Sequence, residues 1–378
     1  MRKLICLLLI LCLLPMAALA KGSTRDGGTR DIDLGEHPAR REAEEGVSPT
    51  TGLPLAERAA EAGEDFAGYA VTGRYQPILL QIDHTNAGAS VTELGSRASW
   101  GLKYADIIYE MPLNAAYVTR LTVLFSDLMP TAVGAVRSAR INSVWLRAEW
   151  EAALASHGYQ DAYYSSVPQE IMRTSPSYNE AFFSGTDGAM NGRKIFVRRT
   201  DAASPFNVTV NLAALSALVP DSLGARQRAF LFTDEAPDKQ KSDSARRIEV
   251  VWGKEIYNYT LVWNAKLGAY QQELHHTDGT TELFSDRETG EPILYQNVII
   301  ECVDTEWIYG DGACPRTLMI GRGNAEYFMG GRHLAGVWSR PEMTDQTVYY
   351  TTDGEELALM RGRTLIVMLP EEREANWK

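Results

Sequence analysis

Arg137 and Arg140 are the side chains of this sequence whose type and spacing best suit the binding of an anion. They lie three residues apart in the stretch Gly134-Ala-Val-Arg-Ser-Ala-Arg-Ile141, between an apolar run and a segment with a helical pattern. A guanidinium presents a rigid fork of donors that matches a carboxylate or a phosphate. At the start of a helix, both would add to the positive field of the unpaired N–H groups. The pattern therefore predicts a site for an anion or an acidic sugar, with Arg120 and Ser138 as further contacts.

A second interpretation of the same arginines stays open. Internal ion pairs with Asp83, Asp106 or Glu110 would merely fix the joint between a strand and a helix. The two interpretations differ in whether the guanidiniums form ion pairs with the protein's own carboxylates or remain available to a ligand.

Asp83 and Glu110 are the candidate acid and base. Each ends an apolar stretch of strand length, and ligands of open α/β sheets collect at the carboxyl ends of strands. Two carboxylates that face one cleft would supply a general acid and a general base, as in glycoside cleavage. His157, which follows a helical pattern and precedes a glycine, would titrate near neutral pH and is a further candidate. The alternatives are an ion pair of one carboxylate with Arg120, and hydrogen bonds from His157 to helix-end carbonyls.

Other kinds of chemistry lack the residues they need. The six histidines show no spacing typical of metal ligands, so no metal site is expected. There is no Gly-x-Ser-x-Gly elbow and no Gly-x-x-x-x-Gly-Lys loop, which argues against serine catalysis and ordinary ATP binding. No cofactor is expected. Asn207, two residues after Pro205, would contact a ligand or shape a turn, and the sequence favours the turn.

The N-terminus has the pattern of a secretory signal peptide. Arg2 and Lys3 precede an apolar run, and Ala18-Leu-Ala20 supplies a small-x-small cleavage pattern that places the mature start near Lys21. The apolar run is shorter than the roughly 20 residues of a membrane-spanning helix, and no other segment reaches that length. Position 21 is lysine and not the cysteine of a lipoprotein. We therefore expect a secreted, extracytoplasmic protein with no transmembrane span after cleavage.

The net charge limits the classes of partner that this protein is expected to bind, and the cysteine content bears on the redox state of its thiols. Loss of the signal peptide removes two positive charges, so the net charge changes from −12 to about −14. Such an acidic protein is a poor match for nucleic acid as a bulk partner. Cys302 and Cys314 remain, and an even pair in an exported protein favours a disulfide, worth about 2–3 kcal/mol for a loop of about 12 residues. Two free thiols are the alternative.

Composition divides the chain into successive regions. The N-terminal unit combines apolar runs with helical patterns at Ser143–Ala155, Val167–Arg173 and Val208–Leu218, which predicts an α/β or α+β domain with a mixed sheet. The C-terminal unit consists of short β-branched and aromatic runs separated by turn signals, which predicts a mostly β domain. The expected regions are a signal peptide (1–20), a flexible charged tether (21–73), the N-terminal domain (74–233), a polar linker (234–246) and the C-terminal domain (247–371).

Short motifs spread over residues 75–370 carry a resemblance to a known family. They are Ile78-Leu-Leu-Gln-Ile-Asp83, Ala105-Asp-Ile-Ile-Tyr-Glu110, Gly134-Ala-Val-Arg-Ser-Ala-Arg140, Ser204-Pro-Phe-Asn207, Asn297-Val-Ile-Ile300 and Gly336-Val-Trp338. Together they resemble the YerB-like family of exported bacterial proteins. The resemblance implies a two-domain extracytoplasmic protein of a kind that is commonly a lipoprotein. This sequence departs from the family in lacking the lipoprotein cysteine and in having Phe206 where histidine usually precedes the asparagine.

These observations lead to one preferred function and two alternatives. We expect a cell-envelope protein that binds an acidic ligand (a wall glycan, a peptide stem or a partner protein) through an arginine-rich cleft in the N-terminal domain. The first alternative is an enzyme that cleaves wall polymer with Glu110 or Asp83 as acid and base. The second is a structural adaptor whose β domain mediates assembly without a small ligand.

Overall fold

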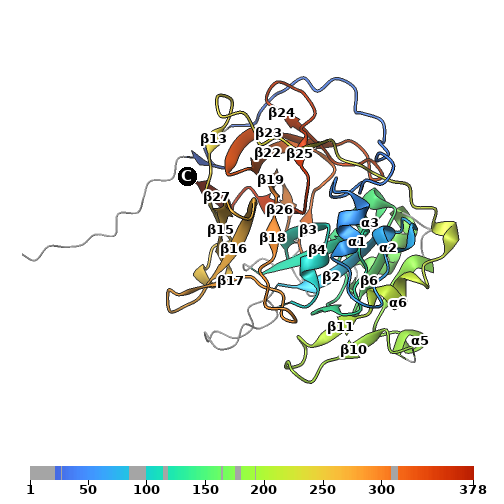
Figure 1. Ribbon diagram of the computed structural model, residues 1–378. Helices are drawn as coiled ribbons and strands as arrows, with labels where there is room; N and C mark the ends of the chain where they lie inside the picture. The colour runs from blue at the N-terminus through green and yellow to red at the C-terminus, as the bar shows by residue number, and fades with distance from the viewer. Residues whose placement is uncertain are drawn as a thin grey trace, which may run out of the picture.

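One mixed sheet of eleven strands runs through the centre of the molecule and takes strands from both halves of the chain (Figure 1). The computed structural model describes residues 22–26, 28–84, 99–113, 118–162, 165–174, 180–191, 193–307 and 314–378. In spatial order the central strands are β13 (Asp243–Ser244), β23 (Arg332–Arg340), β22 (Gly321–Met329), β19 (Asn297–Val303), β26 (Thr364–Pro370), β3 (Ile107–Pro112), β4 (Thr119–Phe125), β2 (Ile78–Asp83), β6 (Ala153–Ser156) and β9 (Phe182–Ser184), with β24 (Val348–Thr351) paired to β23.

The two halves of the chain meet where β26 pairs with β3 in parallel. Leu365 lies opposite Ile108, and Ile366 lies opposite Tyr109. Every residue of both strands is buried. Strands that are covered on both faces need apolar side chains on both, which is why they read in the sequence as continuous apolar runs.

Different layers cover the two faces of the central sheet. One face carries helix α3 (Ile141–Trp150), which is buried along its whole length, and α4 (Val167–Thr174). The other face packs against a second sheet. In spatial order the strands of that sheet are β1 (Gly22–Ser23), β27 (Glu374–Trp377), β14 (Arg247–Val251), β15 (Tyr259–Asn264), β16 (Ala269–His275) and β17 (Thr281–Leu283), with β18 (Leu294–Tyr295) paired to β16.

We call the two sides of the central sheet the α3 face and the second-sheet face. Along β3, Tyr109 belongs to the core on the α3 face, whereas its neighbour Ile108 belongs to the core on the second-sheet face. Leu124 and Val123 of β4 divide in the same way. Because side chains alternate along a strand, the register fixes the face of every residue in the sheet.

The N-terminal half is largely β, so its predicted α/β character is confirmed only in part. The predicted helix Ser143–Ala155 ends before Glu151, whose left-handed conformation (φ 48°) stops the helix, and the chain continues as β6. The predicted helix Val208–Leu218 divides into strand β11 (Val208–Val210) and the short helix α6 (Leu212–Ser216). The C-terminal half is built of strands, as its composition predicts.

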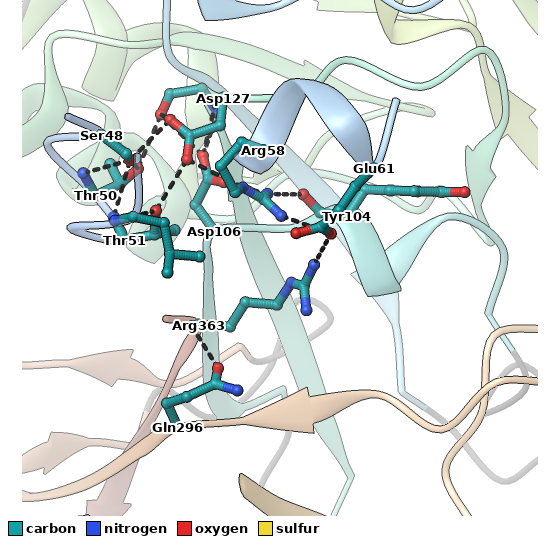
Figure 2. A network of polar contacts seen from close by, with 12 residues as sticks. Ser48, Thr50, Thr51, Arg58, Glu61, Tyr104, Asp106, Asp127, Gln296 and Arg363 are labelled. Atoms are coloured by element: carbon teal, nitrogen blue, oxygen red, sulfur yellow. Dashed lines mark hydrogen bonds and ion pairs between the residues drawn. The ribbon is translucent and has the colours of Figure 1, made fainter. Parts of the chain in front are cut away.

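The segment predicted as a flexible tether is instead packed on the body of the protein. It contains the short helices α1 (Leu55–Ala60) and α2 (Tyr69–Thr72). The side chain of Arg58 is fully buried and pairs with Asp106 (2.9 Å) and Asp127 (3.2 Å), as Figure 2 shows. Ser48 donates a hydrogen bond to the same Asp127 (2.8 Å). Low hydrophobicity predicts disorder, but here buried ion pairs and hydrogen bonds hold the segment in place of apolar burial.

The region predicted as a polar linker also contributes to the fold. Within it, β13 pairs antiparallel with β23 at the end of the central sheet. Ala245 is fully buried, and its N–H donates to the carbonyl of Gly331 (2.9 Å). The predicted signal peptide (1–20) lies outside the described residues. Within the described ranges, no helix is both long enough and apolar enough to cross a bilayer.

Candidate anion-binding site

The segment 135–139 lies where two parallel strands separate. Strands β2 and β6 pair over three residues each, and beyond that point the segment enters between them. The N–H of Arg137 donates to the carbonyl of Gln81 in β2 (2.9 Å). On the other side, the N–H of His157, just after β6, donates to the carbonyl of Arg137 (3.0 Å). This is the carboxyl edge of parallel strands, where open sheets commonly bind ligands.

Arg137 reaches solvent from this edge. Its side chain is 31% exposed, and its Nε lies 3.2 Å from Oδ2 of Asp83, which is fully buried. Its guanidinium carbon also lies 5.5 Å from the ring centroid of Phe206, within the range of a cation–π contact. The ring of Phe206 and the carboxylate of Asp83 contact part of the Arg137 guanidinium. The exposed part of the side chain remains accessible to a ligand.

Arg120 of β4 lies behind Arg137 and is only 5% exposed. Its Nη2 is 3.9 Å from Oδ1 of Asp83, and its Nη1 donates to the carbonyl of Ser138 (3.3 Å). Burial lowers the pKa of Arg120 to about 10. The charge of Asp83 opposes this shift, and the charges of Arg140 and Arg137 add to it. The guanidiniums of Arg137 and Arg140 are therefore close enough to disfavour the protonated form of Arg120.

Arg140 completes the group at the start of α3. Its Nη1 donates to the carbonyls of Ser138 (3.2 Å) and Ala139 (3.0 Å). Its Nε lies 3.1 Å from the sulfur of Cys314. Within the described part of the chain, none of its recorded partners is a carboxylate. Arg120 and Arg140 thus bond the backbone of Ser138 and Ala139, and Arg120 and Arg137 share the carboxylate of Asp83.

Tyr159, which the sequence analysis missed, adds an exposed ring to the same face. It forms a parallel bridge with Ala139, and its side chain is 41% exposed. Its ring packs edge-on against Phe182 of β9, with centroids 5.6 Å apart. Because Ala139 and Arg137 are two residues apart in an extended segment, their side chains share a face. In the sequence, Tyr159 is apparent only as a tyrosine that follows His157-Gly158. Its place beside the arginines becomes apparent only from its bridge to Ala139.

His157 lies after a strand, β6, and not after a helix, so the helix end that the prediction placed before it is β6 instead. Burial lowers the pKa of His157, and the charges of Arg198 and Arg137 lower it further. The imidazole is therefore neutral at neutral pH. In that form it adds no charge to the arginine group.

Asn207 shapes the hairpin of β10 (Phe196–Arg198) and β11. Its Nδ2 donates to the carbonyl of Arg199 (2.8 Å), and its Oδ1 accepts from Arg198 (3.1 Å). Both polar groups of the amide are thus engaged inside the hairpin. This agrees with the turn that the sequence favours and sets the neighbouring Phe206 beside Arg137.

Asp83 and Glu110 do not form the predicted acid–base pair, because they lie on opposite faces of the central sheet. Arg120 lies opposite Asp83 on β2 and opposite Met111 on β3, whereas Glu110 lies opposite Leu121. Directly opposed residues share a face, and neighbours along a strand alternate. Asp83 therefore lies on the α3 face, and Glu110 lies on the second-sheet face with the core around Leu121.

Glu110 instead joins the two sheets. Tyr259 of the second sheet donates to Oε2, Thr119 donates to Oε1 (2.7 Å), and His84 Nδ1 lies 3.2 Å from Oε1. Burial by itself would raise the pKa of Glu110, but His84, Tyr259 and Thr119 hold it below its ordinary value. The residue is 1% exposed and both oxygens are engaged, so it has no opening to a polymer substrate.

Cys302 and Cys314 are free thiols, which corrects the predicted disulfide. Neighbouring side chains of β19 point to opposite faces of the sheet, and Val303, next to Cys302, belongs to the core on the α3 face. Cys302 therefore points to the second-sheet face, whereas Cys314 contacts Arg140 at the start of α3. The sheet separates the two sulfurs. Their spacing in the sequence did not reveal this separation.

The fold and the site together describe a two-part, sheet-based protein with an arginine-rich edge. The family described as "Protein of unknown function (DUF3048) N-terminal domain" matches residues 91–226, and its C-terminal counterpart matches residues 248–366. The chain belongs to this family, and the resemblance stated from the motifs is confirmed.

Similar proteins come from Bacillus subtilis. The chain is 24% identical over 281 residues to "Putative lipoprotein YerB" of strain 168, an alignment that covers 73% of this chain and 78% of that protein. The crystal structure of YerB from the same species superposes with a TM-score of 0.63 at 20% identity, covering 86% of this chain and 97% of that one. This likeness establishes the shared fold.

Proposed function

We propose that this protein binds an acidic component of the bacterial cell envelope through Arg120, Arg137 and Arg140. The observation that carries the proposal is the charge imbalance at the edge of β2 and β6, where three guanidiniums surround one recorded carboxylate, Asp83. Arg137 would make the direct contact because nearly a third of its side chain is exposed. Arg120 and Arg140 would fix the backbone around it and add to the positive field.

The ligand is an acidic glycan. An anionic group would bind Arg137, and the neighbouring ring of Tyr159 would stack on a sugar, because aromatic rings offer a rigid apolar face with little entropy to lose. A charge-assisted hydrogen bond of this kind contributes about 1.5–3 kcal/mol. A peptide stem or a partner's acidic surface would use the same arginine but not the ring.

An extracytoplasmic location supports this choice of ligand. The N-terminal 20 residues have the pattern of a signal peptide, and the similar Bacillus protein is named a lipoprotein. Lys21 stands where a lipoprotein has its cysteine, so we propose that this chain is secreted without that lipid anchor. The wall-cleaving alternative is not carried forward, because its two carboxylates lie on opposite faces of the sheet.

Co-sedimentation of the purified mature protein with bacterial cell-wall sacculi tests the proposal. We expect Arg137→Ala to weaken binding about tenfold, as loss of one charge-assisted bond predicts. The matched control is Arg173→Ala on α4, which removes the same charge from a side chain that is 61% exposed. Tyr159→Ala should weaken binding to walls but not to a soluble acidic peptide. Equal binding by Arg137→Ala and the parent would favour the structural adaptor.

A further inference from the structure

A second cluster of arginines lines a cleft near the C-terminal end of α3, opposite the end at which Arg140 lies. The cleft has a volume of about 240 Å³ and lies between the N-terminal segment and the C-terminal half. Its lining includes the four arginines Arg40, Arg41, Arg226 and Arg228. Ala229 N–H donates to the carbonyl of Arg41 (3.0 Å), so the main chain itself joins two of its walls.

Glu151, at the end of α3, organises three of these arginines. Arg40 binds both its oxygens at 3.0 Å, Arg226 binds it through its backbone N–H (3.2 Å) and its side chain, and Arg228 lies 3.9 Å away. Burial by itself would raise the pKa of Glu151, but hydrogen bonds from Arg226 and Arg40 outweigh it and hold the pKa at about 2. Glu151 is therefore charged at every physiological pH.

The position of Glu151 is unfavourable for an ordinary structural residue. It has φ 48°, a conformation that glycine adopts more readily, and it places a negative charge at the negative end of the helix dipole. Strained residues of this kind collect at functional sites. Here the backbone of Glu151 is strained, and its carboxylate holds Arg40, Arg226 and Arg228 in a fixed arrangement at the cleft.

The charges around the cleft do not balance. Four guanidiniums line the cleft, and the carboxylates that face them are Glu356 and Asp345 of the lining and Glu151, which pairs with Arg40 and Arg226. Glu149, whose charge also acts on Arg228, is paired with Arg340 (3.0 Å) and so does not offset them. Glu356 is taken up by a bidentate pair with Arg41 (2.7 and 2.9 Å). A surplus positive charge therefore remains, in a chain whose net charge is −12.

Of the four cleft arginines, Arg228 makes the fewest side-chain hydrogen bonds to the residues that the structure describes. It is 2% exposed, and its recorded hydrogen bond goes to the carbonyl of Thr344 (2.6 Å). Among the described residues its Nε has no hydrogen-bond partner, and neither has Nδ1 of His37, which also lines the cleft. Burial lowers the pKa of Arg228 to about 10, with Arg40 adding to the shift and Glu149 and Glu151 opposing it. A buried cation without a carboxylate hydrogen bond is costly unless an anion completes its shell.

We propose that this cleft binds a small organic anion, with a phosphate or carboxylate held by Arg228 and Arg41 and a ring set against Phe230 and Tyr349 at its floor. Both rings line the cleft, are buried and pack against each other with centroids 6.0 Å apart. The volume suits a compact molecule. The site is separate from the arginine group around Asp83 and does not depend on the function proposed for that group.

Isothermal titration calorimetry of the mature protein with four probes tests the proposal. The probes are inorganic phosphate, phenyl phosphate, acetate and benzoate, which vary the anionic group and the ring independently. We expect saturable binding of at least one ring-bearing anion, tighter than the matching bare anion. Arg41→Gln and Arg228→Lys should each weaken it about tenfold, which corresponds to one charge-assisted bond. The lysine retains the charge but lacks the guanidinium fork.

Two controls keep the outcome decisive. Arg137→Ala should leave this binding unchanged while it weakens wall binding, so that failure of one proposal is distinguishable from failure of the other. Arg173→Gln removes a charge elsewhere and should also have no effect. If Arg228→Lys fails to fold, Arg41→Gln still tests the site, because its side chain is 38% exposed. Binding of none of the probes at millimolar concentration, or equal binding by parent and Arg41→Gln, would overturn the proposal.

Discussion

Val367 of β26 lies directly opposite Glu110 of β3, and this pairing joins the two halves of the chain in a single sheet. The contact is parallel, and both residues are buried. The two matched family regions, 91–226 and 248–366, therefore contribute to a shared core.

Separately expressed halves should not fold. Cutting the chain in the linker would leave β3 and β26 as unpaired edges whose residues are all buried in the intact protein. We expect residues 22–233 and 247–378 each to show no cooperative thermal transition, and the two together to recover one. Circular dichroism melts would check this. A sharp transition in either isolated half would contradict the shared core.

Glu151→Gly should destabilise the protein even though glycine suits its backbone. Relief of the left-handed conformation would contribute about 1 kcal/mol of stability. Loss of the carboxylate would leave Arg228 and its neighbours without their shared partner, which costs about 3–5 kcal/mol for a buried pair. The net loss should be about 2–4 kcal/mol in urea unfolding. Glu151→Gln separates the two effects, since it keeps the strain, and an increase in stability for the glycine variant would refute the role assigned to the carboxylate.

Asp127 should make the protein less stable as the pH rises from about 4 to 7. Burial raises its pKa to about 7, with the charge of Asp106 adding to the shift and Arg58 opposing it. Unfolded aspartate has a pKa of about 3.9, so between about pH 4 and 7 the folded state binds more protons than the unfolded state. The stabilisation is complete below the unfolded pKa and is lost as the pH rises through the folded one.

Melting temperatures of the parent and Asp127→Asn across this range measure that effect. The variant lacks the titrating group, so its melting temperature relative to the parent should rise with pH. Asp353→Asn, at an exposed position, is the control and should follow the parent. A difference between Asp127→Asn and the parent that stays constant with pH would show that Asp127 does not titrate in this range.

Cys302 should resist thiol reagents. Burial raises its pKa to about 12, with the charge of Glu326 adding to the shift. At a pH below the ordinary cysteine pKa of about 8.5, it holds roughly a thousandfold less thiolate than an ordinary cysteine. We expect the mature Cys314→Ser variant to react far more slowly with Ellman's reagent than Cys302→Ser does. The parent, kept without reductant, should retain two free thiols by mass spectrometry, and recovery of an intramolecular disulfide would contradict the structure.

The sequence by itself determined where most strands lie. Ile78–Asp83, Asn297–Val303 and Thr364–Pro370 are apparent as apolar runs because each is covered on both faces, so nearly every side chain must be compatible with a core. The sequence also singled out Arg137 and Arg140 as a pair of candidate anion ligands, and its motifs identified the family. These are local properties of composition and spacing, which tertiary contacts do not alter.

Only the tertiary structure decided which of these residues meet. The opposite faces of Asp83 and Glu110 follow from the register of three strands, and register is a relation between distant segments that spacing along one segment does not contain. Packing of the segment around Arg58 depends on Asp106 and Asp127, whose carboxylates become its partners only after the sheet has formed. The second arginine cleft arises for the same reason, since Arg40, Arg41, Arg226 and Arg228 come from two distant stretches that the fold brings to one end of α3.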